Sequence, residues 1–387
     1  MQMRNVPMIY HETEHGIPPY LWNLSDTQFY KDKGSVFSCF ACGGGSTMGY
    51  KLAGFDVIGC NEIDKKLVDI YVSNHNPKYV FDCDIRDMLK YEALPRELFN
   101  LDILDGSPPC TSFSMAGNRE KDWGKSKKFR EGQKNQTLDD LSFIFVSLAK
   151  KLQPKVVVIE NVSSLLIGNA KKYANDIYNQ LESAGYHVFH KVLNSKNFGI
   201  PQSRERVFFI GIRNDIAAPL LSYETNIFGS IEMPITCNDS IIPFKNIRID
   251  AGTTISPPLT DLAISLWEKT LPGRSFSDAH ENGSWFNEIK AHPDKPLPTI
   301  RASGLPYDYI APRKIYLEEL LQAFSFPQDY NFLNLSANYV CGMSVPPLII
   351  KNLALTLHSH VLAAKRIDSE LQQADIFMGL SAQRSNK

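Results

Sequence analysis

The sequence predicts an α/β protein with a doubly wound, mostly parallel sheet and a smaller irregular domain. Over residues 35–212, short apolar runs alternate with helical patterns, which is the rhythm of strand–helix units. These runs end in glycine-rich or polar clusters, and ligands of such sheets bind at the carboxyl ends of the strands. From about residue 213 to 305, Pro, Asn and Ser between short apolar runs replace that rhythm.

Composition sets limits on the class of protein. The chain has 387 residues and 43% hydrophobic residues, enough for a sizeable core and more than one domain. The net charge of −1 gives no overall attraction to nucleic acid. Seven irregularly spaced cysteines favour reduced thiols and a cytoplasmic location. We expect no membrane span and no secretory signal, because no run of 18 apolar residues and no basic, apolar leader is present.

The first strand–helix units lie near the start of the chain. Residues 35–41 read as a buried strand that runs into the glycines 43–45, and an amphipathic helix is expected around 46–53. A second strand, residues 57–60, ends at Asn61-Glu62-Ile63-Asp64.

Three further apolar runs complete the predicted sheet. Residues 101–104 lead into Gly106-Ser107-Pro108-Pro109, residues 156–159 end at Glu160-Asn161, and residues 207–212 follow two arginines. Between the first two of these runs, residues 137–152 have helical periodicity, and helical patterns return at 317–324 and 348–364. We therefore expect a catalytic domain over 1–212, a second domain over 213–305, and a segment over 306–387 that packs back on the first.

The glycine turn is suited to a nucleoside ligand. Glycines after a first strand let the backbone approach a ligand closely, and an acid about 20 residues later can hold ribose hydroxyls. Glu62 has that spacing. The turn is not a phosphate-binding P-loop, because Tyr50 stands where that motif requires Lys.

Three other clusters carry reactive groups. Cys110 follows two prolines on a rigid turn after a strand, although a buried structural cysteine is the commoner outcome. Glu160 ends a strongly apolar strand, where loss of solvent would favour its protonated form. Arg204 and Arg206 lead into the last strand, and their spacing predicts that they share one face.

These clusters, in this order, resemble the motifs of the DNA (cytosine-5)-methyltransferase family over about 35–212 and 296–350. The motifs are Phe40-Ala41-Cys42-Gly43-Gly44-Gly45, Asn61-Glu62-Ile63-Asp64, Asp84-Ile85, Pro109-Cys110, Glu160-Asn161-Val162, Gln202-x-Arg204-x-Arg206, Pro298-Thr299-Ile300-Arg301 and Gly342-Met343-Ser344-Val345-Pro346. Cys42, Thr111 and Met343 replace a usual Gly, Gln and Asn, and Tyr316 and Glu318 replace a usual Thr and Arg.

The resemblance implies a Rossmann-like methyltransferase sheet that binds S-adenosylmethionine and leaves S-adenosylhomocysteine as product, without a metal. Cys110 is then the nucleophile toward C6 of a flipped-out cytosine, with Glu160 at N3, Arg206 at O2 and Arg204 in support. The implied cofactor residues are Phe40, Ala41, Gly43, Gly44, Gly45, Glu62, Ile63, Asp84, Ile85, Pro109, Leu138, Ser344 and Val345.

Double-stranded DNA is the implied partner. Residues 118–134 hold seven basic and three acidic side chains directly after the nucleophile, as a lid over phosphates would. The expected DNA contacts are Ser114, Arg119, Lys127, Lys128, Arg130 and Arg301. Residues 213–305 are then a target-recognition domain, and the protein is expected to be a monomer that modifies the site of a cognate restriction endonuclease without stable contact to it.

Alternative functions stay open at this stage. An RNA cytosine-5 methyltransferase on the same scaffold is the main one, and the length of 213–305 favours DNA. Retention of Cys110, Glu160 and both arginines argues against a silent DNA-binding homologue. A nucleotide-dependent oxidoreductase leaves the Pro-Cys and Glu-Asn motifs unexplained. The His11–His15 zinc pattern is dismissed because Gly16, Pro18 and Pro19 follow it, and the lone Cys39-x-x-Cys42 pair because no second pair accompanies it.

Overall fold

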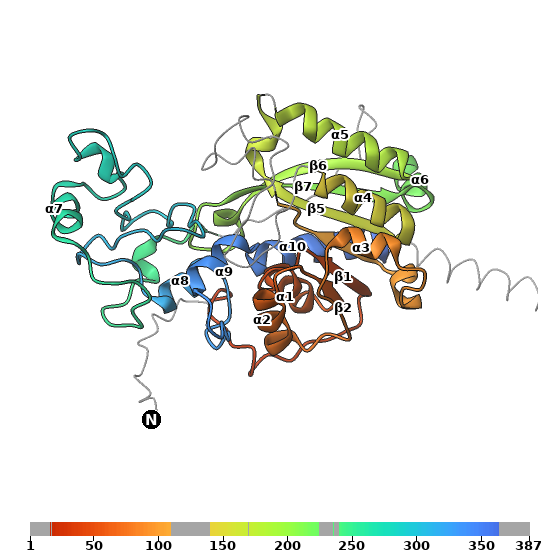
Figure 1. Cartoon of the computed structure of the whole chain (residues 1–387), viewed down its shortest axis with the longest axis horizontal. Helices are drawn as coiled ribbons and strands as arrows, with labels where there is room; N and C mark the ends of the chain where they lie inside the picture. Colours follow the sequence, from red (N-terminus) through yellow and green to blue (C-terminus); the bar gives the residue numbers. More distant parts are fainter. Residues whose placement is uncertain are drawn as a thin grey trace, which may run out of the picture. The chain divides into compact units, whose positions relative to one another are not determined.

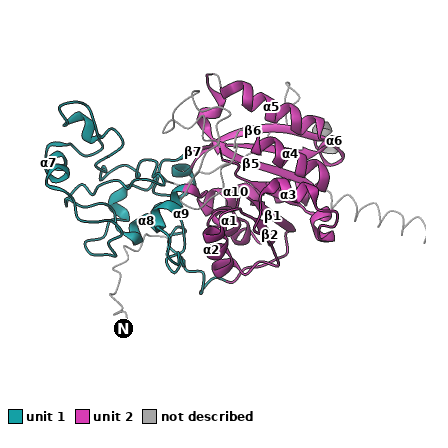
Figure 2. Cartoon of the chain, viewed as in Figure 1, with its two compact units in different colours: residues 1–27, 195–204, 239–342 teal, residues 28–194, 205–238, 343–387 magenta. Residues whose placement is uncertain are grey.

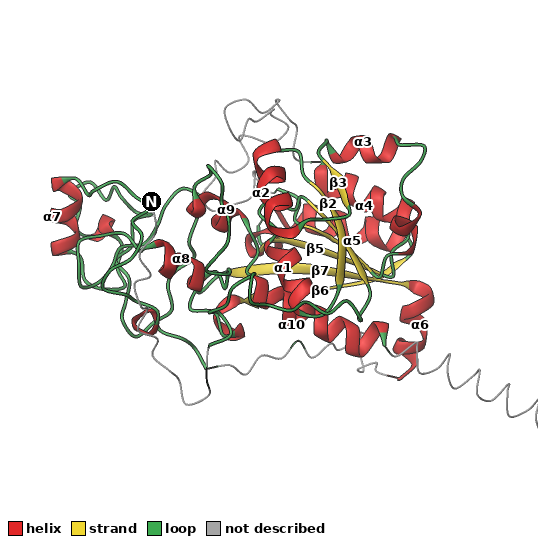
Figure 3. Ribbon diagram, turned by 90° about the horizontal axis from the view of Figure 1, so that it is seen from below, coloured by secondary structure: helices red, strands yellow, loops and turns green. Residues whose placement is uncertain are grey.

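The five strands predicted over residues 35–212 and two further strands form one seven-stranded sheet in the computed structural model of the chain (Figures 1 and 3). Only β7 runs antiparallel to its neighbours, so the predicted mostly parallel α/β sheet is confirmed. In spatial order the strands are β3 Tyr79–Phe81, β2 Asp56–Asn61, β1 Ser35–Cys39, β4 Ile103–Gly106, β5 Val156–Val162, β7 Glu205–Arg213 and β6 Tyr186–Asn194.

The structure describes residue 16 and residues 18–109, 140–168, 170–223, 235 and 240–363. Two compact units divide the chain (Figure 2). The larger unit spans residues 28–194, 205–238 and 343–387 and contains the sheet. The smaller unit spans residues 1–27, 195–204 and 239–342, so each unit is built from segments far apart in the sequence.

Helices cover both faces of the sheet in the larger unit. Their bounds are α1 Gly45–Leu52, α2 Lys65–His75, α3 Ile85–Lys90, α4 Leu141–Leu152, α5 Ala170–Ser183, α6 Asn214–Tyr223 and α10 Pro347–Leu357. Phe37 and Leu104 of the sheet pack in one core cluster with Phe145 of α4 and Ile177 of α5. Because side chains alternate along a strand, Ser38 and Asp105 point to the other face, where Tyr50 of α1 contacts Asp105.

Burial explains why the central strands were recognisable from the sequence. The side chains of residues 156–159 are wholly buried, as expected for a parallel strand covered on both faces. Two strands were not predicted. The three residues of β3 are too few for a periodic pattern, and β6, an edge strand, mixes buried, half-buried and exposed residues rather than forming an apolar run.

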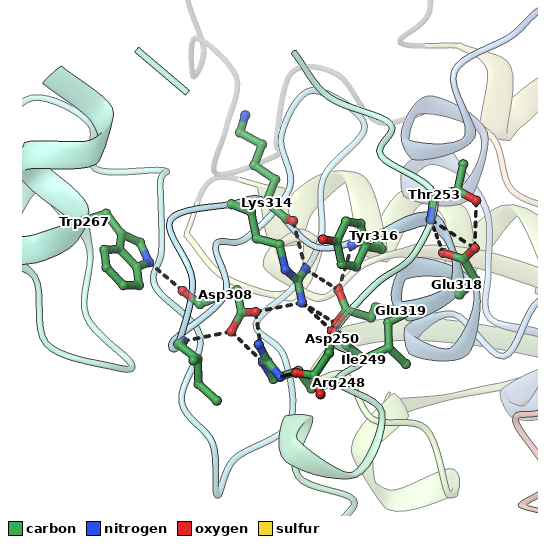
Figure 4. A network of polar contacts seen from close by, with 12 residues as sticks. Arg248, Ile249, Asp250, Thr253, Trp267, Asp308, Lys314, Tyr316, Glu318 and Glu319 are labelled. Atoms are coloured by element: carbon green, nitrogen blue, oxygen red, sulfur yellow. Dashed lines mark hydrogen bonds and ion pairs between the residues drawn. The ribbon is translucent and has the colours of Figure 1, made fainter. Parts of the chain in front are cut away.

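The smaller unit has few regular elements: α7 Asp261–Lys269, α8 Leu317–Ala323 and α9 Ala337–Met343. The unit itself ends at Gly342, one residue before the end of α9. Part of its interior is ionic (Figure 4). Asp308 accepts from Arg248 at 2.9 Å and from Arg313 at 2.7 Å, and Glu319 accepts from Arg313 at 2.8 Å. Both carboxylates are fully buried, so these ion pairs replace an apolar core at this position.

One apolar stretch bears on the expectation that the chain has no membrane span. Residues Ala337–Leu362 are long and apolar enough to cross a membrane by length and composition, and 67% of the most apolar window is buried inside the protein. The helices are interrupted at 344–346, between α9 and α10. Burial of this kind is typical of a core helix.

Candidate active site

The turn after β1 has an unusual backbone. Phe40, Cys42 and Gly44 all have positive φ angles, of 53°, 47° and 77°. Glycine is required at Gly44, because a β-carbon there would overlap the buried imidazole of His75. Cys42 takes up its left-handed conformation without being glycine, and its sulfur lies 3.8 Å from the hydroxyl of Ser344.

His75 of α2 holds this turn through its backbone. It is buried at the end of α2 and hydrogen-bonds the backbone of Gly43. Burial and, to a smaller extent, the charge of Lys51 lower the pKa of His75 to about 3. The imidazole is therefore neutral at physiological pH, and it adds no positive charge beneath the turn.

Glu62 ties the turn to the end of β2. One carboxylate oxygen accepts from the amide of Cys42 at 2.9 Å, and the other accepts from Ile63 at 2.9 Å and Asp64 at 3.0 Å. Burial raises the pKa of Glu62, while these backbone hydrogen bonds lower it. The predicted spacing thus brings the acid against the glycine turn, as a nucleoside site needs.

The other predicted cofactor residues in the described part of the chain differ in exposure. Ile63 keeps 37% of its surface exposed, beside the buried Glu62. The Asp84 carboxylate caps α3 through the amide of Arg86, and the Ile85 side chain belongs to the core. Val345 packs against Gly45, where a β-carbon would overlap the Val345 carbonyl oxygen. A further set of predicted residues lies outside the described residues: Cys110, Ser114, Arg119, Lys127, Lys128, Arg130 and Leu138.

The segment that leads to Cys110 is held by β5. The side-chain amide of Asn161 donates to the carbonyl of Pro108 at 3.2 Å, and its own oxygen accepts from the amide of Val162 at 2.9 Å. β4 and β5 are parallel neighbours, so their carboxyl ends lie side by side. Asn161 was part of a recognised motif, yet sequence reasoning assigned it no role, because its partner is a backbone atom of another strand end.

Glu160 and Arg206 form an ion pair across β5 and β7. Glu160 pairs with Phe208 in the antiparallel register, so Arg206 is its diagonal neighbour on the same face. The Nε–Oε1 distance is 2.9 Å, and the side chains are 14% and 10% exposed for Arg206 and Glu160. Burial lowers the pKa of Arg206, and the charge of Glu160 raises it again.

Arg204 does not share a strand face with Arg206, which corrects the prediction from spacing. β7 begins at Glu205, and Arg204 belongs to the smaller unit. Its guanidinium donates to the carbonyls of Ile300 at 3.1 Å and Gly342 at 2.9 Å, and lies over the ring of Phe324.

Two other motif residues of the smaller unit bind backbone. The side-chain nitrogen of Gln202 donates to the Ala323 carbonyl at 2.8 Å, and its side-chain oxygen accepts from the backbone amide of Ile300 at 3.0 Å. Arg301 donates to the carbonyl of Asn287 at 2.7 Å. Much of the Gln-x-Arg motif therefore joins distant backbone segments within this unit.

The sheet order, the glycine turn and the buried acid at the second strand define an α/β enzyme of the kind that binds a nucleoside cofactor. Known proteins agree. The C-5 cytosine-specific DNA methylase family matches residues 34–359. The Type II methyltransferase M.FnuDI of Fusobacterium nucleatum is 36% identical over 88% of this chain and 99% of its own length. The Type II methyltransferase M1.HphI of Haemophilus parahaemolyticus is 29% identical over 81% and 84%.

The chain belongs to the C-5 cytosine-specific DNA methylase family and is a DNA (cytosine-5)-methyltransferase. Solved structures agree on the fold. A mutant of the Spodoptera frugiperda DNMT2 aligns with a TM-score of 0.58 and 15% identity over 84% of this chain and 99% of its own. The S. pombe Dnmt2 methyltransferase aligns at 0.55 and 14% over 84% and 98%.

S-adenosylmethionine, the methyl donor of this family, fits the residues present. A buried carboxylate suits ribose hydroxyls, and an exposed apolar Ile63 next to it suits the flat face of a base. Gly43, Gly44 and Gly45 add no side chains to the turn that follows β1, so the backbone there can approach a ligand closely.

Proposed function

We propose that the protein methylates C5 of a cytosine within a specific duplex DNA sequence, through a covalent bond between Cys110 and C6 of a flipped-out base. The observation that carries this proposal is the arrangement at the ends of β4 and β5. Asn161 donates to the carbonyl of Pro108, two residues before Cys110. Glu160, the residue that precedes Asn161 in β5, forms the ion pair with Arg206. A target base must leave the stack to reach such buried groups.

Cys110, Glu160 and Arg206 each act on a different atom of the cytosine ring in this proposal. Glu160 is ionised in its pair with Arg206, so it takes up a proton from solvent when the base enters. The Cys110 thiolate forms a bond to C6, and the C5–C6 double-bond electrons shift toward N3 as Glu160 passes this proton to N3. Arg206 binds the O2 oxygen beside it. S-adenosylmethionine, when bound, supplies an electrophilic methyl group for C5. The C5 proton then passes to a solvent-connected base, the C6–sulfur bond breaks, the double bond re-forms, and N3 returns its proton to Glu160.

Cofactor binding is assigned to the turn after β1. The proposed cofactor contacts of described residues are the backbone of Phe40, Ala41 and Gly43–Gly45, the carboxylate of Glu62, and the side chain of Ile63. His75 is neutral and therefore does not repel the positively charged sulfonium of the cofactor. The aromatic ring of Phe40 can attract that charge. The assignments of Asp84, Ile85, Pro109, Ser344 and Val345 remain predictions from the motifs, and Leu138 lies outside the described residues.

The source of sequence specificity is a further part of this proposal. Residues 213–305 choose the sequence, while basic side chains in 118–134, with Lys127 and Lys128 among them, contact phosphates irrespective of sequence. Relatives named Type II methyltransferases support a modification enzyme paired with a restriction endonuclease. Likeness to Dnmt2 structures concerns the fold alone and does not favour RNA over DNA.

Trapping with a fluorinated base tests the mechanism. Duplex DNA from the organism's methylated sites, made with 5-fluorocytosine, should give an adduct that survives denaturing electrophoresis, because fluorine at C5 cannot leave as a proton. The adduct should map to the peptide containing Cys110. Cys110→Ala should lose trapping, and the matched Cys83→Ser, a half-buried cysteine of the same unit, should keep it. An adduct on another cysteine would refute the nucleophile, and methylation of the same sequence only as RNA would refute the substrate.

A further inference from the structure

A buried carboxyl that the proposed chemistry does not use lies in the middle of the sheet. Asp105 of β4 is 1% exposed and pairs with Ser38 of β1 in the parallel register. Leu104 faces the core beneath α4 and α5, so Asp105 points to the opposite face. Among the residues that the structure describes, no lysine or arginine forms an ion pair with Asp105.

Hydroxyl groups take the place of a cation. The Ser38 hydroxyl donates to one carboxylate oxygen at 2.9 Å, and the Tyr50 hydroxyl donates to the other at 3.2 Å. The Ser46 side chain also hydrogen-bonds this carboxylate. Ser46 and Tyr50 are four residues apart on α1 and therefore share one helix face. Asp105 thus fastens the first turns of α1 to β1 and β4.

The start of α1 needs such a fastening. Gly44 is its N-cap, in the left-handed conformation and without a side-chain hydrogen bond to the helix. The backbone amides of a helix start are the groups that a ligand can use, and their direction depends on how the first turn is held. On its other side α1 is held by the Thr47 hydroxyl, 2.7 Å from that of Tyr71.

We propose that Asp105 is a positioning residue for the cofactor, which anchors the first turn of α1 and thereby sets the backbone of the glycine turn that takes S-adenosylmethionine. This inference rests on the proposed cofactor site.

The ionised carboxylate is the form that can accept from all three hydroxyls at once, because a protonated carboxyl gives up one acceptor position. The pKa of Asp105 is raised to about 7, because burial and the charge of Glu160 raise it more than the hydroxyl hydrogen bonds lower it. Cys39, Tyr50 and Tyr71 feel the charge of Asp105 and stay neutral themselves, because burial raises their pKa values as well. Loss of anchoring is therefore expected as the pH falls below about 7.

The test is cofactor affinity by calorimetry in Asp105→Asn, with S-adenosylmethionine and S-adenosylhomocysteine as separate probes. Positioning predicts at least a tenfold loss for both ligands alike, because the backbone contacts are common to both. A loss confined to S-adenosylmethionine, which alone carries the sulfonium charge, would show a through-space charge effect and overturn positioning. Unchanged affinities would overturn it as well. Failure of the wild type to bind either ligand would instead contradict the proposed cofactor site.

Matched variants separate this role from general stability. Asp102→Asn removes an acid next to β4 that binds Lys155 at 2.6 Å and the Ser35 amide, away from the turn. It should lower the melting temperature and leave both affinities unchanged. Ser38→Ala and Tyr50→Phe each remove one hydrogen-bond donor to Asp105 and should lower cofactor affinity less than Asp105→Asn does. Either change should add little to the loss when it is combined with Asp105→Asn. These two variants carry the test if Asp105→Asn does not fold.

The pH dependence of cofactor affinity is a second test, because a purely structural role of Asp105 would not change it. Affinity of the wild type for S-adenosylhomocysteine should rise between pH 5.5 and 8.5 (a range chosen as roughly 1.5 units around neutrality), and Asp105→Asn should lose that rise. The same pH profile in both proteins would overturn the assignment.

Discussion

Asn161 holds the backbone of the segment that leads to Cys110, the proposed nucleophile. Its amide binds the Pro108 carbonyl at the end of β4 while its oxygen binds the Val162 amide. Pro108 itself and Pro109, the one residue between this contact and Cys110, restrict the chain further. The backbone up to Pro109 is therefore held both by β5 and by the stiffness of the two prolines.

Replacing Asn161 should affect the chemical step more than binding. Asn161→Ala frees the Pro108 carbonyl, and a small displacement of a reacting group can cost about 10²-fold in rate. We expect kcat to fall by roughly 10- to 100-fold, with S-adenosylhomocysteine affinity nearly unchanged. Single-turnover methylation and calorimetry measure the two effects. Asn179→Ala, at an exposed position of α5, serves as the control, and an equal loss of kcat there would contradict the assignment.

At the scale of elements, α8 begins in an ionic rather than an apolar setting. Glu319 accepts from the amide of Tyr316 at 2.7 Å, within a capping box, and also pairs with the half-buried Arg313. Arg313 lies 3.8 Å from the ring of Tyr316. Tyr316, one of the departures from the family motif, is therefore accounted for by its stacking on this guanidinium.

Breaking this network should destabilise the smaller unit strongly. Glu319→Ala leaves Arg313 without one buried partner and removes the cap, for a cost of about 3–5 kcal/mol in the free energy of unfolding. Glu318→Ala on the same helix removes only exposed bonds to Thr253 and should cost no more than about 1 kcal/mol. Urea unfolding followed by Trp267 fluorescence compares them, and similar losses in the two variants would refute this account.

At the scale of the whole molecule, the buried acid in the sheet opposes stability at high pH. The pKa of Asp105 is raised from 3.8 to about 7 in the folded protein, so the folded state holds this proton more tightly than the unfolded state. Its contribution is fully present below about pH 4 and is lost as the pH rises through about 7. Binding of a cationic cofactor offsets part of that loss by mass action.

The difference in unfolding free energy between wild type and Asp105→Asn should reveal this contribution. As the pH rises from 4 to 8 (about one unit beyond the folded pKa), the variant should gain on the wild type by up to roughly 4 kcal/mol, at 1.36 kcal/mol per pKa unit. Urea titrations at several pH values measure the gain. A constant difference across this range would show that Asp105 has the same pKa in both states.

The sequence by itself determined the strand–helix order, the central apolar strands, and the positions of the glycine turn, Glu62 and Glu160, because each depends on local periodicity or on a motif read in order. The short β3 and the edge strand β6 escaped it, since neither forms an apolar run.

Only the tertiary structure decided which groups meet. It separated Arg204, bound to the backbone of the smaller unit, from Arg206, paired with Glu160. It also placed Asn161 on the Pro108 carbonyl and Asp105 against the hydroxyls of α1. These partners are backbone atoms or neutral side chains from distant segments, whose meeting depends on strand order and register rather than on any local pattern.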